Sequence, residues 1–563
     1  MLKTLSRFSR FRAVSLIASC FGLAVLVNNA SAQFGVSPSQ TSTFFDDFRS
    51  RSNQMQKGGA GVRTGDVVYD YESGTYVGTE EEGQARPEDL LRQSREIAQP
   101  AVRSGSAAFA ARSVGDYTNY SGQYSAPTGF FAPTYTSDPF LSGKRNVKLG
   151  PVNIGLGLYQ AFEYNSNVNR SNVNPISDVI STTMLSIDAN YRITQNNVLS
   201  LTTAIGFDHY FDHPELAPYG NGNYILNVLP GSTLAFDVKA GPLYFTFYDR
   251  VSVRPAVNNA FTLNNQSIFG VFQNDAGFAM NWAINSAWSL ALNFNNSISR
   301  ALQGNFSQYD RMMNTIQGTL TYSPQGTWST GIEGGVSLLK YDQPILNDGT
   351  LANVGLFFRT PLGRTTFLRI AAGAQLFNFD TSTVGPPLGP GDNTDLNDFY
   401  FNFSISNQIN NRVSHSLTLG HESALNLASN FITADFINYG ISVITSKGGR
   451  LSLTGYFERA EPSSFNPLFP GAQQDLIQYG FDLYYNHQLT SKIRMGAGYH
   501  FGITDSEAAN GDFDQHAFNL DFTAMLTQKA SINLGYRYFL TNTYNNNQDF
   551  DQHRFILGLN YNF

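Results

Sequence analysis

Long apolar runs are missing from almost all of this chain. Beyond the N-terminal region, no stretch approaches the roughly 20 consecutive apolar residues that a membrane-spanning helix needs. Mean hydropathy is −0.22, and only 14% of the 563 residues are charged. Aromatic residues nevertheless make up 14% of the chain, which is high for a soluble enzyme. A sheet with lipid on one face combines these properties, because every second side chain can stay polar.

Cysteine and positive charge are also scarce. The single cysteine, Cys20, lies in a region that we expect to be removed on export. We therefore predict no disulfide and no cysteine metal site in the mature protein. The formal net charge of −7 argues against a nucleic-acid partner, because such binding depends on Lys and Arg. We also predict no cofactor.

The N-terminus has the parts of a secretory signal peptide. A basic segment precedes an apolar run over residues 13–27, and Ala30 and Ala32 supply the small residues of a cleavage site. We therefore expect residues 1–32 to be a signal peptide. The four residues that end at Cys20 also resemble a lipoprotein cleavage box, which is an alternative with a shorter apolar run.

Residues 33–145 differ in composition from the rest of the chain. They are rich in Ser, Gly, Thr, Gln and Ala and show little alternation. One short amphipathic helix is expected over residues 87–99, because Pro87 stands at its start and Pro100 ends it. We interpret this low-complexity segment as a flexible periplasmic extension. The alternative is a segment that enters the lumen of a barrel as a partial plug.

Residues 146–563 repeat one pattern, in which about ten residues alternate between apolar and polar before a turn. Over residues 198–211, for example, Leu199, Leu201, Ile205 and Phe207 share one face, and Asp208 lies on the other. Alternation of period two is the signal of a strand with one apolar face. The region is therefore predicted to be all-β.

Short turns divide this region into hairpins. Each of these turns is dense in Gly, Pro, Asn or Ser, as tight turns require; they lie at residues 195–197, 240–242, 285–286, 324–326, 361–364, 410–411, 446–449, 490–492 and 527–529. These hairpins and one further strand at each end give about 20 strands, an even number as in bacterial single-chain barrels. A missed or false hairpin would give 18 or 22.

These strands predict a transmembrane antiparallel β-barrel with a mostly irregular N-terminal extension. Both ends of the barrel then lie on the periplasmic side, and the longer loops face outward. A soluble β-sandwich also alternates, but its loops do not alternate between short and long over such a length. Residues 212–230 and 254–274 are predicted to be the longest loops and to fold inward.

The last strand carries a second signal of this class. Its apolar face ends at the C-terminal aromatic residue and resembles the signal that the outer-membrane barrel-assembly machinery reads; it consists of Phe555, Leu557, Leu559, Tyr561 and Phe563. Alternation, terminal position and a signal peptide occur together here. We therefore expect this machinery and outer-membrane lipid as partners, and the outer membrane of a Gram-negative bacterium as the location.

Charged residues opposite the apolar stripe are the candidates for the lining of a pore. Both signs are present, so these residues would filter solutes by charge or simply satisfy one another; they are Asp188, Asp208, Asp237, Lys239, Glu333, Arg369, Asp482, Arg494, Asp521 and Arg537. Residues 146–563 hold 21 Lys and Arg against 30 Asp and Glu, a balance of −9 that weakly favours cations.

Three motifs invite other interpretations. Residues 512–516 and 549–553 have the same sequence, DFDQH, and form either a polar collar that binds a cation or sugar or simply a duplicated hairpin. His209 and His213 are spaced like metal ligands, but we predict no metal site because they flank the end of a strand. His421 and Ser423 suggest a hydrolase, but nothing in the sequence shows that a catalytic set converges, and we predict that the protein is not an enzyme.

The barrel region resembles the putative β-barrel porin families of Gram-negative bacteria, in particular those associated with surface polysaccharide export. The resemblance is carried by residues 164–168 (YNSNV) and by Ser177-Asp178. It implies a porin-like channel for passive diffusion of small hydrophilic solutes. The alternatives are a component of surface polysaccharide export or assembly, which would bind glycan, and a structural or adhesive barrel with a closed lumen. A homo-oligomer is possible under each.

Overall fold

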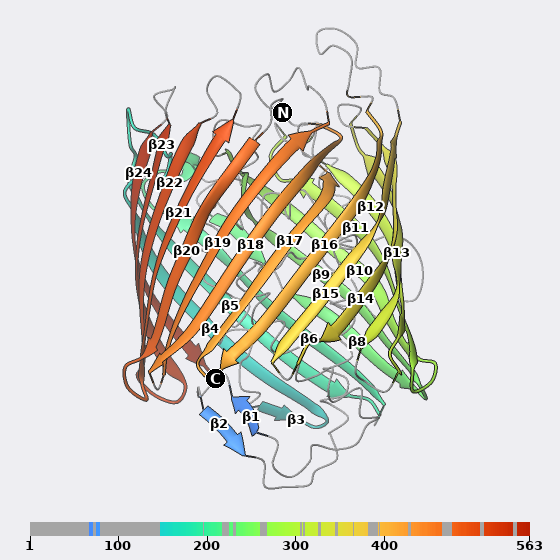
Figure 1. The fold of residues 1–563 in the computed structure, drawn as a ribbon. Helices are drawn as coiled ribbons and strands as arrows, with labels where there is room; N and C mark the ends of the chain where they lie inside the picture. The colour runs from blue at the N-terminus through green and yellow to red at the C-terminus, as the bar shows by residue number, and fades with distance from the viewer. Residues whose placement is uncertain are drawn as a thin grey trace, which may run out of the picture.

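The computed structural model is a closed antiparallel β-barrel with strongly tilted strands (Figure 1). It describes residues 67–70, 75–78 and 147–563, the last with gaps that lie mainly in loops, of which the longest are 217–223, 259–266, 381–391 and 464–475. The strands of the barrel are β3 (Val147–Leu149), β4 (Val152–Asn165), β5 (Asp178–Arg192), β6 (Asn197–Tyr210), β7 (Tyr224–Val228), β8 (Thr233–Ala240), β9 (Leu243–Asn258), β10 (Ser267–Ala283), β11 (Trp288–Ala301), β12 (Arg311–Tyr322), β13 (Ser329–Tyr341), β14 (Gly349–Pro361), β15 (Thr366–Phe379), β16 (Leu396–Asn410), β17 (Val413–Leu425), β18 (Phe431–Ser446), β19 (Gly449–Pro462), β20 (Leu476–Gln488), β21 (Ile493–Ser506), β22 (Phe513–Met525), β23 (Ala530–Thr543) and β24 (Phe550–Asn562).

These elements make a wall of 20 strands, which confirms the predicted fold class and number. β7 and β8 together occupy one position, because both pair with β6. β3 adds no position, because it pairs with the lower end of β4, while β24 pairs with the rest of the same edge. The barrel therefore closes between its first long strand and its last, as the sequence predicts.

The predicted short turns all join consecutive strands at one end of the barrel, where the C-terminus also lies (Figure 1). In outer-membrane barrels this is the periplasmic end, and the longer loops face the outside. Two predicted long loops are wrong, however. Residues 212–230 include the 3-10 helix η2 (Pro214–Leu216) and the wall strand β7, and residues 254–274 belong mostly to β9 and β10. Their polar composition hid strand segments, since pairing with neighbours overrides weak alternation.

The two faces of the wall differ in polarity. On β24, the side chains of Phe555, Leu557 and Leu559 are about half exposed and face outward, whereas Gln552 and Asn560 are buried on the inner face. The other strands with this alternation repeat the arrangement, so the exterior is an apolar band. Among the described residues, no helix is long and apolar enough to cross a membrane.

The N-terminal predictions fall largely outside the described residues. These include the signal peptide, its cleavage residues Ala30 and Ala32, and the helix over residues 87–99. Within residues 33–145 the structure describes only a two-stranded antiparallel ladder of β1 (Val67–Asp70) and β2 (Thr75–Gly78). The expected roles of this segment, as extension or plug, therefore stay predictions.

The Tyr400 ring lies against the inner wall where two glycines leave room. In register, Glu333 of β13 faces Gly355, Gly355 faces Gly373, and Gly373 faces Tyr400 of β16. A Cβ at Gly355 would meet the Tyr400 hydroxyl oxygen at 2.0 Å, and one at Gly373 would meet Val354 O at 2.1 Å. The glycines therefore let the ring cross two strands and reach Glu333.

Candidate functional site in the inner wall and the mouth

All ten predicted pore-lining residues lie on strands, on the face opposite the exposed apolar side chains. The ladders show this, since Asp237 faces Val198, a residue buried on the inner face, and Asp482 faces His500, which is also buried. The remaining eight follow the same alternation; they are Asp188, Asp208, Lys239, Glu333, Arg369, Arg494, Asp521 and Arg537. Whether they line a conducting pore stays a prediction.

An enclosed ion pair of the inner wall joins Glu333 and Arg369, with 2.9 Å between Oε2 and Nη2. The Tyr400 hydroxyl donates a hydrogen bond to the other carboxylate oxygen of Glu333 at 3.2 Å. Glu333 is 2% exposed. Such a buried carboxylate is tolerated only because a cation and a hydroxyl satisfy it.

Other inner charges also pair with neighbours in the wall. Asp482 accepts a bond from the His500 ring at 2.7 Å, and Asp521 lies 3.8 Å from Arg537. Asp208 accepts bonds from Thr182 and Asn227 on adjacent strands. These three inner carboxylates therefore each have a partner on a neighbouring strand.

One ion pair that the sequence pattern does not identify joins the two strands that close the barrel. Arg554 of β24 donates two hydrogen bonds to Glu163 of β4, at 2.6 and 2.7 Å. Two parallel bonds of this kind add geometric specificity as well as energy. A charge on each of the two predicted closing strands was the available signal, since both alternate onto the inner face.

The inner wall becomes apolar near the long-loop end between β10 and β19. The buried cluster there includes Leu351, Phe377 and Leu396, which face one another across β14, β15 and β16. Phe379 and Phe431 stack with 6.4 Å between ring centroids. The barrel mouth thus has an apolar patch above a polar wall.

Four loops meet above this patch, at what we call the Asp392 junction. Asp392 accepts hydrogen bonds from the backbone N–H of Asn430 at 2.8 Å and from the Ser463 hydroxyl at 2.6 Å. The Asn347 side chain donates to the backbone oxygen of Asp392 and to Asn430. These residues come from the loops that follow β13, β15, β17 and β19, so the junction ties four loops together at the mouth.

The surroundings of several charged groups in other outer loops shift the pKa values of those groups. Burial lowers the pKa of Arg170, in the loop after β4, to about 10. Burial also raises the pKa of Asp310, which accepts a hydrogen bond from the backbone N–H of Ala301 at 2.7 Å. A hydrogen bond to Glu215 raises the pKa of His213 on the exposed loop after β6.

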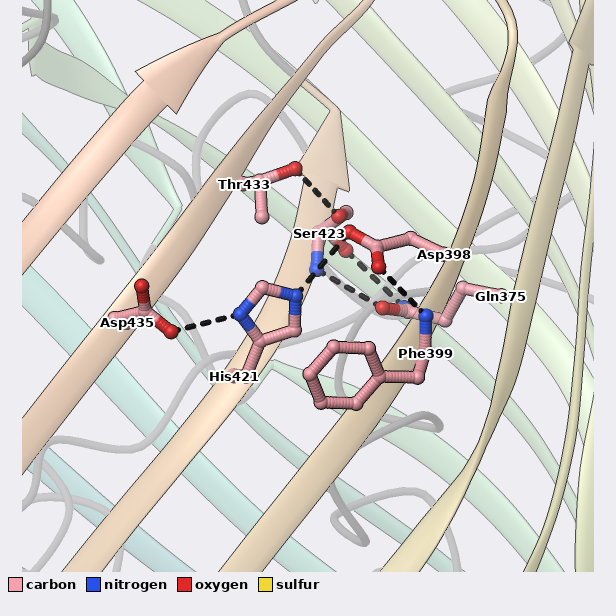
Figure 2. Close-up of polar contacts among 7 residues, drawn as sticks. All are labelled: Gln375, Asp398, Phe399, His421, Ser423, Thr433 and Asp435. Atoms are coloured by element: carbon pink, nitrogen blue, oxygen red, sulfur yellow. Dashed lines mark hydrogen bonds and ion pairs between the residues drawn. The ribbon is translucent and has the colours of Figure 1, made fainter.

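The structure brings His421 and Ser423 close but does not couple them. Both ring nitrogens of His421 face carboxylates, Asp435 at 2.7 Å and Asp398 at 3.2 Å (Figure 2). The Ser423 hydroxyl instead bonds Thr433 at 2.8 Å. A serine nucleophile needs a base within hydrogen-bond reach. His421 is not placed to act as this base, because both of its ring nitrogens face carboxylates.

The duplicated DFDQH motif forms two matching outward-facing arrangements. His516 takes a hydrogen bond from the Tyr499 hydroxyl at 2.8 Å and bonds Asp514 through its other nitrogen at 2.9 Å. His553 contacts Tyr536 at 3.0 Å in the same way and lies 3.5 Å from its own preceding aspartate. The motifs therefore lie where predicted, at the outer ends of β22 and β24.

The other histidine motif does not converge on one point. His209 stacks on Tyr224 with 4.6 Å between ring centroids, whereas the His213 ring bonds Glu215 at 2.9 Å. Within the part of the chain that the structure describes, no three residues among His, Cys, Asp and Glu are grouped to hold a metal ion.

The exterior decides the location of the chain. A closed barrel has no free strand edge, and this one presents an apolar band to its surroundings, which is how β-sheets satisfy their backbone in lipid. The protein is a β-barrel of the Gram-negative outer membrane.

Outer-membrane proteins are also found among the similar solved structures. The siderophore receptor PirA from Pseudomonas aeruginosa is 8% identical with a TM-score of 0.44, over 74% of this chain and 81% of that chain. The FrpB iron transporter from Neisseria meningitidis is 10% identical with a TM-score of 0.45, over 76% and 83%. OmpT of Vibrio cholerae is 10% identical with a TM-score of 0.31, over 74% and 99%.

No protein-family model matches the chain, and no curated protein matches it. The resemblance to the polysaccharide-associated porin families, carried by residues 164–168, therefore stays a prediction. In the structure, this segment extends the contact between β4 and the last strand, β24. The Ser166 backbone N–H donates to His553 O, and the Asn167 side chain donates to Asp551 O, each at 2.9 Å.

Proposed function

We propose that this outer-membrane barrel is a porin-like channel for passive diffusion of small hydrophilic solutes. The observation that carries the proposal is the polar inner wall, in which charges of both signs pair between strands instead of forming one apolar core. A barrel of about 20 strands is wide enough for water, since 16–18 strands already leave an aqueous channel. Selection would come from the wall charges and from the loops of the Asp392 junction.

Planar-bilayer recording tests this proposal. Purified full-length protein should give stepwise current increases. A salt gradient should give a weak reversal potential of cation-selective sign, because residues 146–563 carry a balance of −9. Liposome swelling in sugars of increasing size would measure the size limit. Electrical silence together with no swelling in any sugar would contradict the channel.

A closed structural barrel is a second candidate, supported by the burial of the inner wall. Asp237 and Gln375 are completely inaccessible, and Arg311 is 1% exposed. Deletion of residues 33–145 separates the two candidates. A silent full-length protein that conducts after this deletion would indicate a plugged barrel, and silence in both forms would favour the closed one.

We propose further that the protein has no catalytic activity, which is supported by the engaged nitrogens of His421. A hydrolase would show turnover that His421→Ala abolishes. Its expected partners are outer-membrane lipid along the apolar band and the barrel-assembly machinery at the last strand. Replacing Phe563 by a charged residue should reduce the amount of assembled barrel in cells, measured by heat-modifiable gel migration.

A further inference from the structure

The ladder between β16 and β17 ends before either strand does. Its last pair is Phe401 with His421, although β16 begins at Leu396 and β17 continues to Leu425. The ladders on both sides, β15–β16 and β17–β18, run to these strand ends. The wall therefore has a notch at its long-loop end, which we call the β16–β17 notch, between residues 396–400 and 422–425.

A glutamine side chain takes the place of the missing strand partner. Gln375 of β15 reaches past β16 to the backbone of Ser423 on β17 (Figure 2). Its Oε1 accepts from the Ser423 N–H at 3.0 Å, and its Nε2 donates to the Ser423 carbonyl at 3.3 Å. A neighbouring strand would provide the same two bonds. Gln375 thus satisfies the backbone across the notch without restoring the ladder.

Side chains also contact one another across the notch. Phe399 of β16 is 57% exposed and stacks on the His421 ring, with 4.4 Å between ring centroids. Asp398 also reaches His421 from β16 (Figure 2). These contacts can separate without breaking a ladder pair. Above the notch, the hydrogen bonds from Asn430 to Asp392 and to Thr394 O still tie the loops that border the two strand ends, and these bonds would have to open as well.

On the inner side, the notch borders the apolar patch of the mouth. Leu396 and Leu425, the end residues of the two strands, both belong to that buried cluster, together with Phe377 and Phe431. On the exterior, His421 and the exposed ring of Phe399 lie beyond the outward pair of Phe403 and Leu419, so the notch lies at the long-loop edge of the apolar band. An opening here would connect an apolar inner surface to the level of the lipid headgroups.

We propose that the β16–β17 notch is a lateral port through which single-chain amphiphiles pass between the outer leaflet and the barrel mouth. The apolar patch accommodates the alkyl chain, and the polar edge around His421 accommodates the headgroup. The port extends the proposed channel function, because it gives the same mouth a second route and a second class of substrate.

Cross-linking across the notch tests this port. Phe399→Cys and Ser423→Cys, introduced together, place one thiol on each side, and the mature chain is expected to have no other cysteine. A bifunctional maleimide with a cleavable spacer would join them. The matched control is Ala352→Cys with Leu376→Cys, which are direct partners in the fully paired β14–β15 ladder near the same end of the barrel.

Two cargoes are followed in proteoliposomes of the full-length protein. One is a fluorescent dodecyl sulfonate, whose permanent charge prevents spontaneous crossing, with entrapped albumin as the acceptor. The other is sucrose, measured by swelling. The port predicts that cross-linking the notch reduces sulfonate transfer to the protein-free rate, that cleaving the spacer restores it, and that sucrose flux is unchanged. The control cross-link should change neither rate.

Other outcomes overturn the port. Sulfonate transfer that persists after cross-linking, or loss of both cargoes together, would show that no lateral route exists. Sulfonate transfer sensitive to the cross-link without any sucrose flux would support the port and contradict the hydrophilic channel. A second variant, Gln375→Ala, should increase sulfonate transfer, whereas Gln478→Ala, which alters a buried inner glutamine in a complete ladder, should not. Equal effects of the two would also overturn it.

Discussion

Replacing Gly373 with alanine tests how the inner wall is packed. A Cβ there would lie 2.1 Å from Val354 O and 2.4 Å from Tyr400 Cε1. Because one neighbour is backbone, the ring alone cannot relieve the overlap. Overpacking of this kind costs about 1–3 kcal/mol. If the ring moves, the bond to Glu333 is also lost, and a bond to a charged group contributes about 1.5–3 kcal/mol. We expect the free energy of unfolding to fall by about 3 kcal/mol.

The matched control is Gly440→Ala, also on the inner face. Its Cβ would lie 3.4 Å from Ser416 Oγ and 3.8 Å from Thr454 Oγ1, which is ordinary contact. Alanine there should be neutral or stabilise by about 0.5 kcal/mol, because the unfolded chain loses freedom. Urea titration of protein folded into lipid vesicles, followed by tryptophan fluorescence, would compare the two. Equal midpoints would refute the packing argument.

Three further predictions concern charge. Glu163→Gln should lower the free energy of unfolding by about 1–2 kcal/mol, a value between those of exposed and buried ion pairs, because Arg554 loses its carboxylate partner. Urea titration measures this change, and an unchanged midpoint would contradict the prediction. Asp392→Ala should loosen four loops and raise single-channel conductance in planar bilayers; equal conductance would show that the junction does not restrict the mouth. His213 should titrate above an ordinary histidine, so its charged pair with Glu215 is present below the ordinary pKa and is lost as the pH rises through the raised one; in histidine NMR, Glu215→Gln should lower this pKa.

The sequence pattern predicts the strands of the barrel wall. It does not predict the contacts that connect the loops or the irregularities within the wall. Alternation and turn residues are local, so the strands, the hairpins and the closing pair of strands follow from the sequence. The Asp392 junction depends on loops that are far apart in sequence, and no local pattern marks it. The split of β7 from β8 was missed because the five-residue strand Tyr224–Val228 is bounded by polar loop residues.

The inner face was easier to predict than its contacts. Alternation assigns Glu333 and Arg369 to this face, but they lie on β13 and β15, so pairing between neighbouring strands does not mark them as partners. The notch could not be predicted, because Gln375 looks like any other inward polar residue. Its importance comes from the ladder between β16 and β17, which ends before either strand does.

The repeated DFDQH hairpins differ at the position that follows the motif. In the first copy this residue is Ala517, and in the second it is Arg554, the residue that bonds Glu163 of the first strand. Duplicating such a hairpin would widen a barrel by two strands while keeping both termini on the same side of the membrane. Only the copy that meets the first strand needs the arginine. The closure of the cylinder therefore uses one residue that the two copies do not share, together with the motif's own Gln552, which donates to Asn167 O at 2.6 Å.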